Sequence, residues 1–364
     1  MILCSNPSEQ FKSYQSEIEE AAIAVMRSNR YVLGKEVDYL EREFADYIGT
    51  TSAIGVANGT DAIELSLRAL NIGIGDEVIT VSHTAVATVA AIECTGAKAV
   101  LVDIEPKSFT LNPIQLEECL TKRTKAIIAV HLYGHAADLD SILTFCHSHK
   151  VFLIEDASQA HGAKYKGKRL GSFGDFGCFS CYPTKNLGAI GDAGLITTNS
   201  IDLANKIRML REYGWENRTS IYPGRNSRLD ELQATILRIK LKYLDLDNQK
   251  RRNLAKFYYD NLSSLPIILP LIHSNVESVF HLFVIQVENR HSLLNFLKQE
   301  GIIAGIHYPL AIHQHPAYKG RILTAKDMSI TESLVQNIIS LPMYPELSNS
   351  DANKIVSALK RFYN

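Results

Sequence analysis

This chain of 364 residues has no long hydrophobic run and no excess of charge of either sign. No apolar segment reaches the roughly 18 residues that a membrane span needs, and the most apolar one, residues 84–102, is interrupted by Glu93 and Lys98. The formal net charge is −1, with Lys and Arg spread along the chain. The sequence therefore predicts no membrane partner and no basic surface for nucleic acid.

Cysteine is also scarce, and no basic segment precedes the short apolar start. We therefore expect no signal peptide. The six cysteines are scattered, which suits reduced thiols in a cytoplasmic protein. Cys178 and Cys181 form a C-x-x-C pair without a second pair at zinc spacing, and His313 and His315 have no third ligand close in the sequence. No metal site is predicted.

What the chain does have is a regular alternation of strand and helix patterns from residue 52 to about residue 200. Such alternation predicts βαβ units around a mostly parallel sheet, so the expected fold class is α/β. The expected strands are residues 52–58, 76–82, 98–104, 125–132, 151–157, 176–182 and 193–199, and the expected helices are residues 59–70, 84–96 and 139–149.

The rest of the chain has a different character. Residues 229–262 are charged and nearly free of Gly and Pro, which predicts a long connecting helix. Later segments mix a strand pattern at 278–287 with helix patterns at 290–301 and 331–340. We therefore expect two domains: residues 1–250, a large domain with an N-terminal helical segment, and residues 251–364, a smaller C-terminal α/β domain.

Polar residues that could bind a ligand follow two of the expected strands. Ligands of open parallel sheets bind at the carboxyl ends of the strands. Gly59 and Thr60 precede a helix, where free N–H groups and a hydroxyl can bind an anion, although Gly-Thr is also common as a plain cap. Asp156 ends another strand and can pair with a buried cation beside Gln159, although an aspartate here can equally cap a helix.

A third feature is Lys185, in a turn of small residues after the strand that contains Ser180. A partly desolvated lysine has a lowered pKa and can form a Schiff base with a carbonyl, although a solvated loop lysine fits the same pattern. Taken together, an anion site, a carboxylate and a reactive amine meet the needs of pyridoxal phosphate. Its phosphate needs donors, its pyridine nitrogen needs an acid and its aldehyde needs an amine.

Six segments resemble the DegT/DnrJ/EryC1/StrS family of sugar aminotransferases, which have the aspartate-aminotransferase fold (fold type I). The likeness runs from about residue 20 to about residue 360. The segments are NGTDAIELSL, HLYGHAADLD, EDASQAHGAKYKGKRLGSFGDFGCFSCYPTKNLGAIGDAG, GRNSRLDELQA, GIHYPLAIHQHPAY and SLPMYPEL.

The resemblance implies roles for the residues around the cofactor ring. Lys185 would hold pyridoxal phosphate as a Schiff base and move the proton between substrate carbon and cofactor. Asp156 would pair with the pyridine nitrogen, and Gln159 would contact the ring hydroxyl.

The resemblance also implies a phosphate site and a sugar site. The phosphate would be bound by Gly59, Thr60 and Ser180. Asn226 would reach the phosphate held by the other subunit of a homodimer with shared active sites. The sugar-nucleotide pocket would be lined by His307, Tyr308 and His313.

One segment departs from the family pattern. The family usually has an aromatic residue stacked on the cofactor ring, within a T-aromatic-x-A-T segment. Here Ala85 takes that place, and His83 is an alternative for stacking. Lys185 is present, which disfavours the dehydratase branch, where histidine replaces it. We expect His161 to be a core residue.

The activity implied is transamination with pyridoxal phosphate as cofactor. L-glutamate would give its amino group and leave as 2-oxoglutarate, and a dTDP- or UDP-linked keto-deoxysugar would receive the group at C3 or C4. The amino sugar would serve lipopolysaccharide or other surface polysaccharide, or antibiotic, biosynthesis. One alternative is a non-catalytic regulator of the same fold, which the intact set of Lys185, Asp156 and Ser180 disfavours. Another is an NAD-type oxidoreductase, which the missing G-x-G-x-x-G disfavours.

Overall fold

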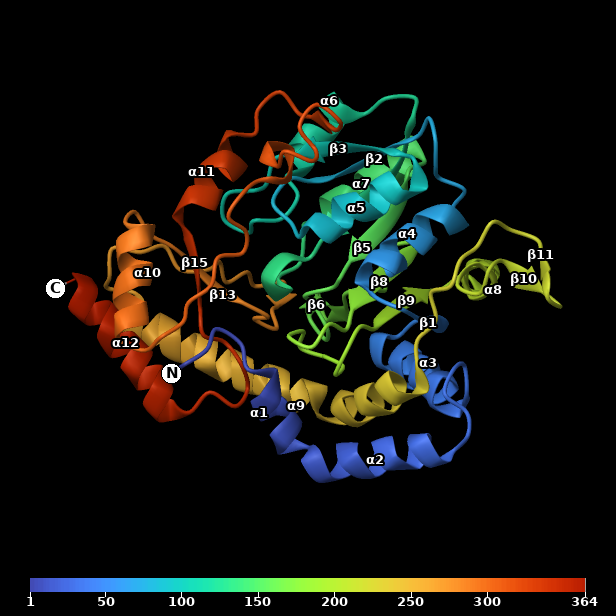
Figure 1. The fold of residues 1–364 in the computed structure, drawn as a ribbon. Coiled ribbons are helices and arrows are strands. Elements are labelled where there is room, and N and C mark those ends of the chain that lie inside the picture. The colour runs from blue at the N-terminus through green and yellow to red at the C-terminus, as the bar shows by residue number, and fades with distance from the viewer. Residues whose placement is uncertain (364) are drawn as a thin grey trace.

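The computed structural model describes residues 1–363, and its centre is an eight-stranded sheet (Figure 1). Of these strands, β9 runs antiparallel to both of its neighbours and the others are parallel to one another, so their carboxyl ends meet at one edge. The order is β1 (Ser52–Val56), β9 (Gly194–Thr198), β8 (Phe176–Ser180), β5 (Phe152–Asp156), β4 (Thr124–Val130), β2 (Glu77–Val81), β3 (Lys98–Val102) and β14 (Leu323–Thr324).

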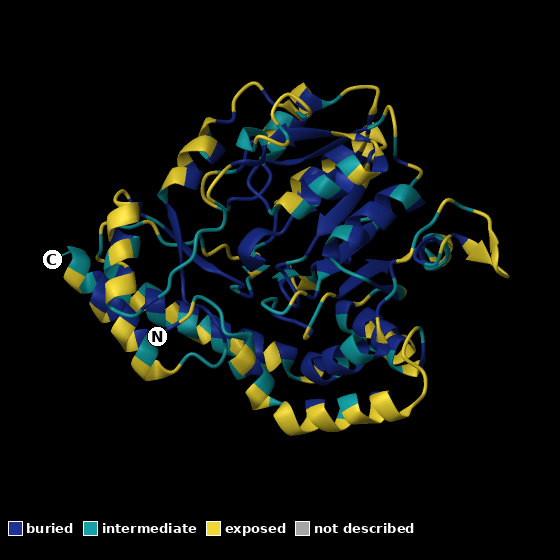
Figure 2. Ribbon diagram, viewed as in Figure 1, coloured by how far each residue is buried: buried dark blue, intermediate teal, exposed yellow. Residues whose placement is uncertain are grey.

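Helices cover both faces of this sheet. Nearly every residue of its longer strands is buried (Figure 2), and successive strand residues point to opposite faces, so neither face is left to solvent. Two of the helices, α4 and α5, lie side by side over the sheet (Figure 1). The helices of this region are α3 (Lys35–Ile48), α4 (Gly59–Ala69), α5 (Val86–Thr95), α6 (Leu116–Cys119), α7 (Leu139–His149) and α8 (Ile201–Leu210).

A single long helix, α9 (Glu231–Leu262), connects this core to a second one. The second core contains Tyr258, Phe283 and Leu359 from the C-terminal part, together with Ile2 from the start of the chain. The predicted boundary at residue 250 therefore falls inside a continuous helix and stays a prediction. The elements here are β13 (Phe283–Gln286), β15 (Ile338–Leu341), α10 (Arg290–Gln299), α11 (Ser329–Asn337) and α12 (Asn349–Tyr363).

The remaining elements lie at the periphery. A hairpin projects from the body of the molecule and is exposed on its outer side (Figures 1 and 2). Among residues 1–363, no helix combines the length and apolar character needed to cross a bilayer. The peripheral elements are α1 (Pro7–Ser13), α2 (Gln15–Arg27), the projecting hairpin β10 (Trp215–Glu216) and β11 (Thr219–Ser220), and a small sheet of β12 (Val276–Glu277), β6 (Lys164–Tyr165) and β7 (Lys168–Arg169).

The expected strands and helices between residues 52 and 200 are present, and so is the long helix. The expected helix at 331–340 is wrong at its end. The helix stops at Asn337, and β15 follows because its residues pair with β13, Ile339 opposite Ile285. Branched side chains favour such a pairing once a partner strand is available.

Candidate active site

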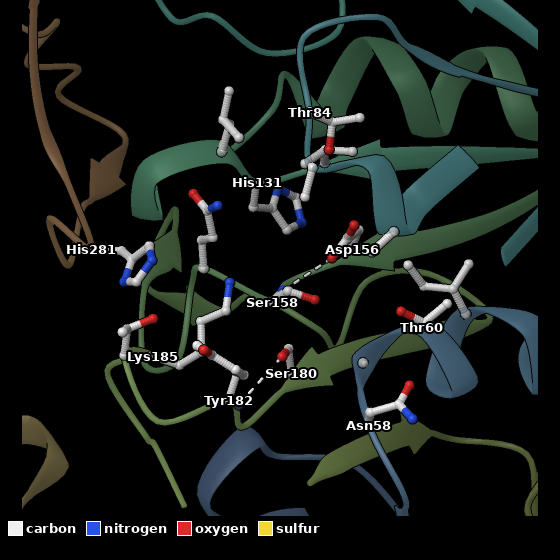
Figure 3. A pocket seen from close by; sticks show the side chains of 18 of the residues that line it. Asn58, Thr60, Thr84, His131, Asp156, Ser158, Ser180, Tyr182, Lys185 and His281 are labelled. Carbon is white, nitrogen blue, oxygen red and sulfur yellow. Dashed lines mark hydrogen bonds between the residues drawn. The ribbon is translucent and has the colours of Figure 1, made fainter. Parts of the chain in front are cut away.

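A cavity of about 590 Å³ opens where the carboxyl ends of β1, β4, β5 and β8 meet (Figure 3). The residues that line it come from distant segments of the chain, from Asn58 to Tyr308. The predicted site residues that it brings together are Gly59, Thr60, Asp156, Gln159, Ser180, Lys185, His307 and Tyr308. Asn226 and His313 are not among the residues that line it.

One side of the cavity is built to receive an anion. Helix α4 begins here, and the side chain of Asn58 caps it by accepting from the N–H of Asp61 at 2.8 Å. The N–H groups of Gly59 and Thr60 have no partner within residues 1–363, and the helix dipole favours a negative charge beside them. Ser180 adds a hydroxyl from the end of β8 (Figure 3).

Gly59 is required at this position by a close approach. A Cβ on Gly59 would lie 2.6 Å from the Cβ of Ser180 and 3.2 Å from its Oγ. Any other residue would push β8 away from α4. The absence of a side chain therefore keeps the hydroxyl of Ser180 beside the helix N-terminus.

The carboxylate of Asp156 is held by two donors. Thr88 Oγ1 donates to Oδ2 at 2.8 Å, and the N–H of Ser158 donates to Oδ1 at 3.2 Å. Thr88 is itself 3.0 Å from the hydroxyl of Thr84, which lines the cavity. The sequence analysis predicted no role for Thr88, although it lies three residues after Ala85, in the segment that departs from the family pattern.

Lys185 has an amine that is easily deprotonated. Burial lowers its pKa to about 8, although Asp156 opposes the shift. The backbone N–H of Lys185 donates to the backbone carbonyl of Tyr182 at 2.8 Å, and Lys240 Nζ donates to the carbonyl of Gly188 at 2.7 Å. The turn that carries the lysine is therefore fixed at both ends, and a substantial share of the amine is neutral near pH 8.

Gln159 is held by two neighbours. Its Oε1 accepts from the N–H of Tyr133 at 2.7 Å, and its Nε2 donates to the hydroxyl of Tyr308 at 3.0 Å. Burial raises the pKa of Tyr308 to about 12, so its hydroxyl keeps its proton at neutral pH. The predicted contact between Gln159 and a ring hydroxyl stays a prediction.

His131, which follows β4, was missed by reasoning from the sequence. Its Nδ1 accepts from the N–H of Ala137 at 3.1 Å, so Nε2 carries the proton and donates to Glu155 at 3.0 Å. Burial alone would raise the pKa of Glu155, but the hydrogen bonds from His131 and from the N–H groups of Gly171 and Gly174 lower it overall. Both nitrogens of His131 are therefore used within the protein.

Three further histidines lie away from the cavity wall. His83 is fully buried with Nε2 2.6 Å from the hydroxyl of Tyr133, and burial lowers its pKa to about 3. The cavity is instead lined by Ala85, so nothing in the structure supports stacking by His83. His161 is also fully buried. His313 is held by Ser82 at 2.7 Å and by Glu332 at 2.9 Å, which keeps it out of the pocket wall.

Asn226 lies at the surface of the chain. It forms an isolated bridge with Glu212, and its Oδ1 accepts from Arg228 Nε at 3.0 Å. Its predicted role is at the cavity of a second subunit. Its place outside the cavity of its own chain therefore does not test that role, which stays a prediction.

Comparisons with known proteins agree with this geometry. The family model described as the DegT/DnrJ/EryC1/StrS aminotransferase family matches residues 12–360. The chain belongs to this family. It is 45% identical to dTDP-3-amino-3,6-dideoxy-α-D-galactopyranose transaminase of Aneurinibacillus thermoaerophilus, over 96% of each protein.

Solved structures extend the family likeness to the fold. DesV of Streptomyces venezuelae, solved in complex with a ketimine intermediate, has a TM-score of 0.97 at 40% identity and covers 100% of this chain and 98% of its own. NtdA of Bacillus subtilis, solved with bound cofactor PMP, has a TM-score of 0.88 at 30% identity and covers 96% of this chain and 82% of its own. The expected aspartate-aminotransferase-like α/β fold and the family are confirmed.

The protein is an aminotransferase that depends on pyridoxal phosphate. The cavity fits this cofactor. The close packing of Gly59 on Ser180 leaves a helix N-terminus and a hydroxyl free for the phosphate. Across the cavity stand a carboxylate for the ring nitrogen and an amine for the aldehyde (Figure 3).

Proposed function

We propose that this aminotransferase moves the amino group of L-glutamate to a ketone of a dTDP- or UDP-linked deoxysugar. The observation that carries the proposal is the meeting of Lys185, Asp156 and the α4 N-terminus in one cavity. The named relative makes a dTDP-linked sugar with its amino group at C3, which favours C3 over C4 here. The product would serve surface polysaccharide or antibiotic biosynthesis.

Each residue has a role that follows from its chemistry. When bound, pyridoxal phosphate would supply the electron-withdrawing ring that carries the amino group from one substrate to the other. Gly59, Thr60 and Ser180 would bind its phosphate, and Asp156, positioned by Thr88, would pair with its ring nitrogen. Lys185 would bind the aldehyde and move the proton at the substrate carbon, because its lowered pKa makes the neutral amine available.

We also propose that the active unit is a homodimer in which Asn226 reaches the other subunit's cofactor. Asn226 lies outside its own cavity, and it forms a bridge with Glu212, which shortly precedes the projecting hairpin. The hairpin region exposes Tyr213, Trp215 and Ile221, and exposed apolar side chains gathered in this way are typical of interfaces.

The visible absorption spectrum of the purified protein tests the cofactor and the amino donor together. A yellow band that bleaches on addition of L-glutamate, and returns with a nucleotide-linked 3-keto sugar, is expected. Bound cofactor that does not respond to glutamate would instead support the non-catalytic regulator of the same fold.

The variant Lys185→Ala gives the matching prediction for catalysis. Removal of the amine takes away both the attachment point and the proton carrier, so amino transfer is expected to fall by at least about a hundredfold. Steady-state rates with glutamate and the keto sugar measure this. Near wild-type turnover in the variant would exclude the assigned role of Lys185.

A further inference from the structure

His281 stands in the cavity wall on the same side as Lys185 (Figure 3). It lies just before β13, well after the segment that carries Lys185 in the sequence. Only 7% of the residue is exposed. The roles assigned above do not use it, yet it is a buried polar group at the ligand cavity.

A hydrogen-bond network determines which nitrogen of His281 carries the proton. Asn186 Nδ2 donates to the carbonyl of Val279 at 3.1 Å and to Oδ1 of Asn248 at 2.8 Å. Asn248 is anchored in turn, because its Nδ2 donates to the carbonyl of His161 at 2.8 Å. Since backbone carbonyls can only accept, both amides have one possible orientation. Oδ1 of Asn186 therefore faces His281 Nδ1, 3.1 Å away.

The result is an imidazole that presents a lone pair to the cavity. Oδ1 of Asn186 can only accept, so Nδ1 of His281 carries the hydrogen and Nε2 is an acceptor in the neutral ring. Burial lowers the pKa of His281 well below its usual value, and Lys185 acts in the same direction, so the ring stays neutral. Nε2 has no hydrogen-bond partner within residues 1–363. It is not fully buried either, so a ligand in the cavity can reach it.

We propose that Nε2 of His281 accepts a hydrogen bond from a hydroxyl of the sugar substrate and so helps to determine sugar specificity. The proposal rests on the proposed function and deepens it.

The chemistry of the two substrates assigns His281 to the sugar. A lone pair needs a donor, and the carboxylates of glutamate and 2-oxoglutarate can only accept. The remaining donor of glutamate is its amino group, which is the group that reacts. A sugar has hydroxyl groups besides its reacting carbon. His281 therefore serves one half-reaction, and a buried acceptor left without its hydroxyl would select against sugars that lack it.

Two variants at His281 form a matched pair. In His281→Asn, the amide can still donate to Asn186 but does not extend to the position of Nε2. In His281→Gln, the longer side chain can place an amide oxygen near that position. The affinity for pyridoxal phosphate, measured by titration, is expected to stay within about twofold of wild type in both, because neither change touches the phosphate site.

The experiment measures each half-reaction separately by single-turnover bleaching of the visible band. The probes are L-glutamate and dTDP-3-amino-3,6-dideoxy-α-D-galactopyranose, with UDP-linked 3-amino sugars tested alongside. His281→Asn is expected to lower kcat/KM for the amino sugar by about tenfold or more, with the glutamate rate nearly unchanged, and His281→Gln to recover part of the loss.

Three outcomes would overturn the proposal. Equal loss in both half-reactions would indicate that His281 acts through Lys185, which serves both, rather than by binding the sugar. An unchanged amino-sugar rate in His281→Asn would show that Nε2 contacts no substrate hydroxyl, while leaving the proposed function intact. A wild-type protein that reacts with glutamate but with none of the amino sugars would contradict the proposed substrate class, and the role of His281 with it.

Discussion

The amine of Lys185 gives the site a pH dependence that can be measured without a sugar substrate. Its pKa is lowered to about 8 by burial, and only the neutral amine attacks the aldehyde of the cofactor. The rate at which cofactor-free protein captures pyridoxal phosphate is therefore expected to rise about tenfold per pH unit below pH 8 and to level off above it. Stopped-flow absorbance from pH 6.5 to 9.5 measures this; a rate still rising at the upper limit would indicate an unshifted lysine.

At the residue scale, local patterns predict Lys185 and Asp156 but miss residues whose roles depend on tertiary contacts, including His131. Asp156 ends β5 and Lys185 stands in the turn after β8, and parallel strands place their carboxyl ends at one edge. His281 precedes its strand, and its acceptor character depends on Asn186 and Asn248. Thr88 is recognisable only once α5 packs beside Asp156. These roles come from tertiary contacts that no local pattern contains.

The contact between α4 and β8 should control cofactor affinity. Gly59→Ala would place a methyl group 2.6 Å from the Cβ of Ser180, so the helix N-terminus and the hydroxyl must separate. The Kd for pyridoxal phosphate is expected to rise by about tenfold or more. Gly73→Ala is the control, since its nearest contact would be Thr95 O at 3.3 Å, outside the cavity. Equal affinities in the two variants would contradict the assigned phosphate site.

A second prediction at the element scale concerns the start of α3. The buried carboxylate of Glu231, from α9, accepts from the N–H groups of Gly34, Glu36 and Val37 at 2.8, 3.0 and 2.9 Å. Glu231→Gln removes the charge and one acceptor. The free energy of unfolding, measured by urea denaturation, is therefore expected to fall by about 1–3 kcal/mol. Exposed Glu216→Gln, at the same protein concentration, should change stability little.

Elements with strong local periodicity were predictable, and their ends were less so. The five- to seven-residue strands of the central sheet and the uninterrupted α9 have clear patterns of apolar residues, whereas the two-residue β6 and β7 have none. Residues 338–341 continue a helical pattern in the sequence, but they form a strand because β13 offers a pairing edge. The short β14 joins β3 from more than 200 residues away, and two residues give no periodic signal.

For the whole molecule, the sequence predicts the fold class and the family, but two of the predicted site residues, Asn226 and His313, do not line the cavity of a single chain. Gly59, Ser180 and Lys185 line the same cavity, whereas Asn226 does not. α9 contributes to three apolar clusters, one of them with Ile18 of α2. The outer side of α2 exposes Ile23 and Met26, and with the exposed hairpin it forms a surface available for other contacts. A closed, two-fold arrangement would place Asn226 of each subunit at the other's cavity.

Mixed dimers test this arrangement directly. Lys185→Ala removes the amine, and Asn226→Asp is expected to weaken the site by placing a negative charge near the phosphate; each variant alone should have little activity. In a heterodimer of the two, purified through different affinity tags, shared sites would put both changes in one cavity and leave the other intact. About half of the wild-type activity is then expected.

If Asn226 instead served its own subunit, each cavity would carry one change and activity would stay near background. Recovery of activity therefore separates a shared site from two independent ones. Its absence, when a wild-type dimer carrying the same two tags is fully active, would contradict the proposed dimer.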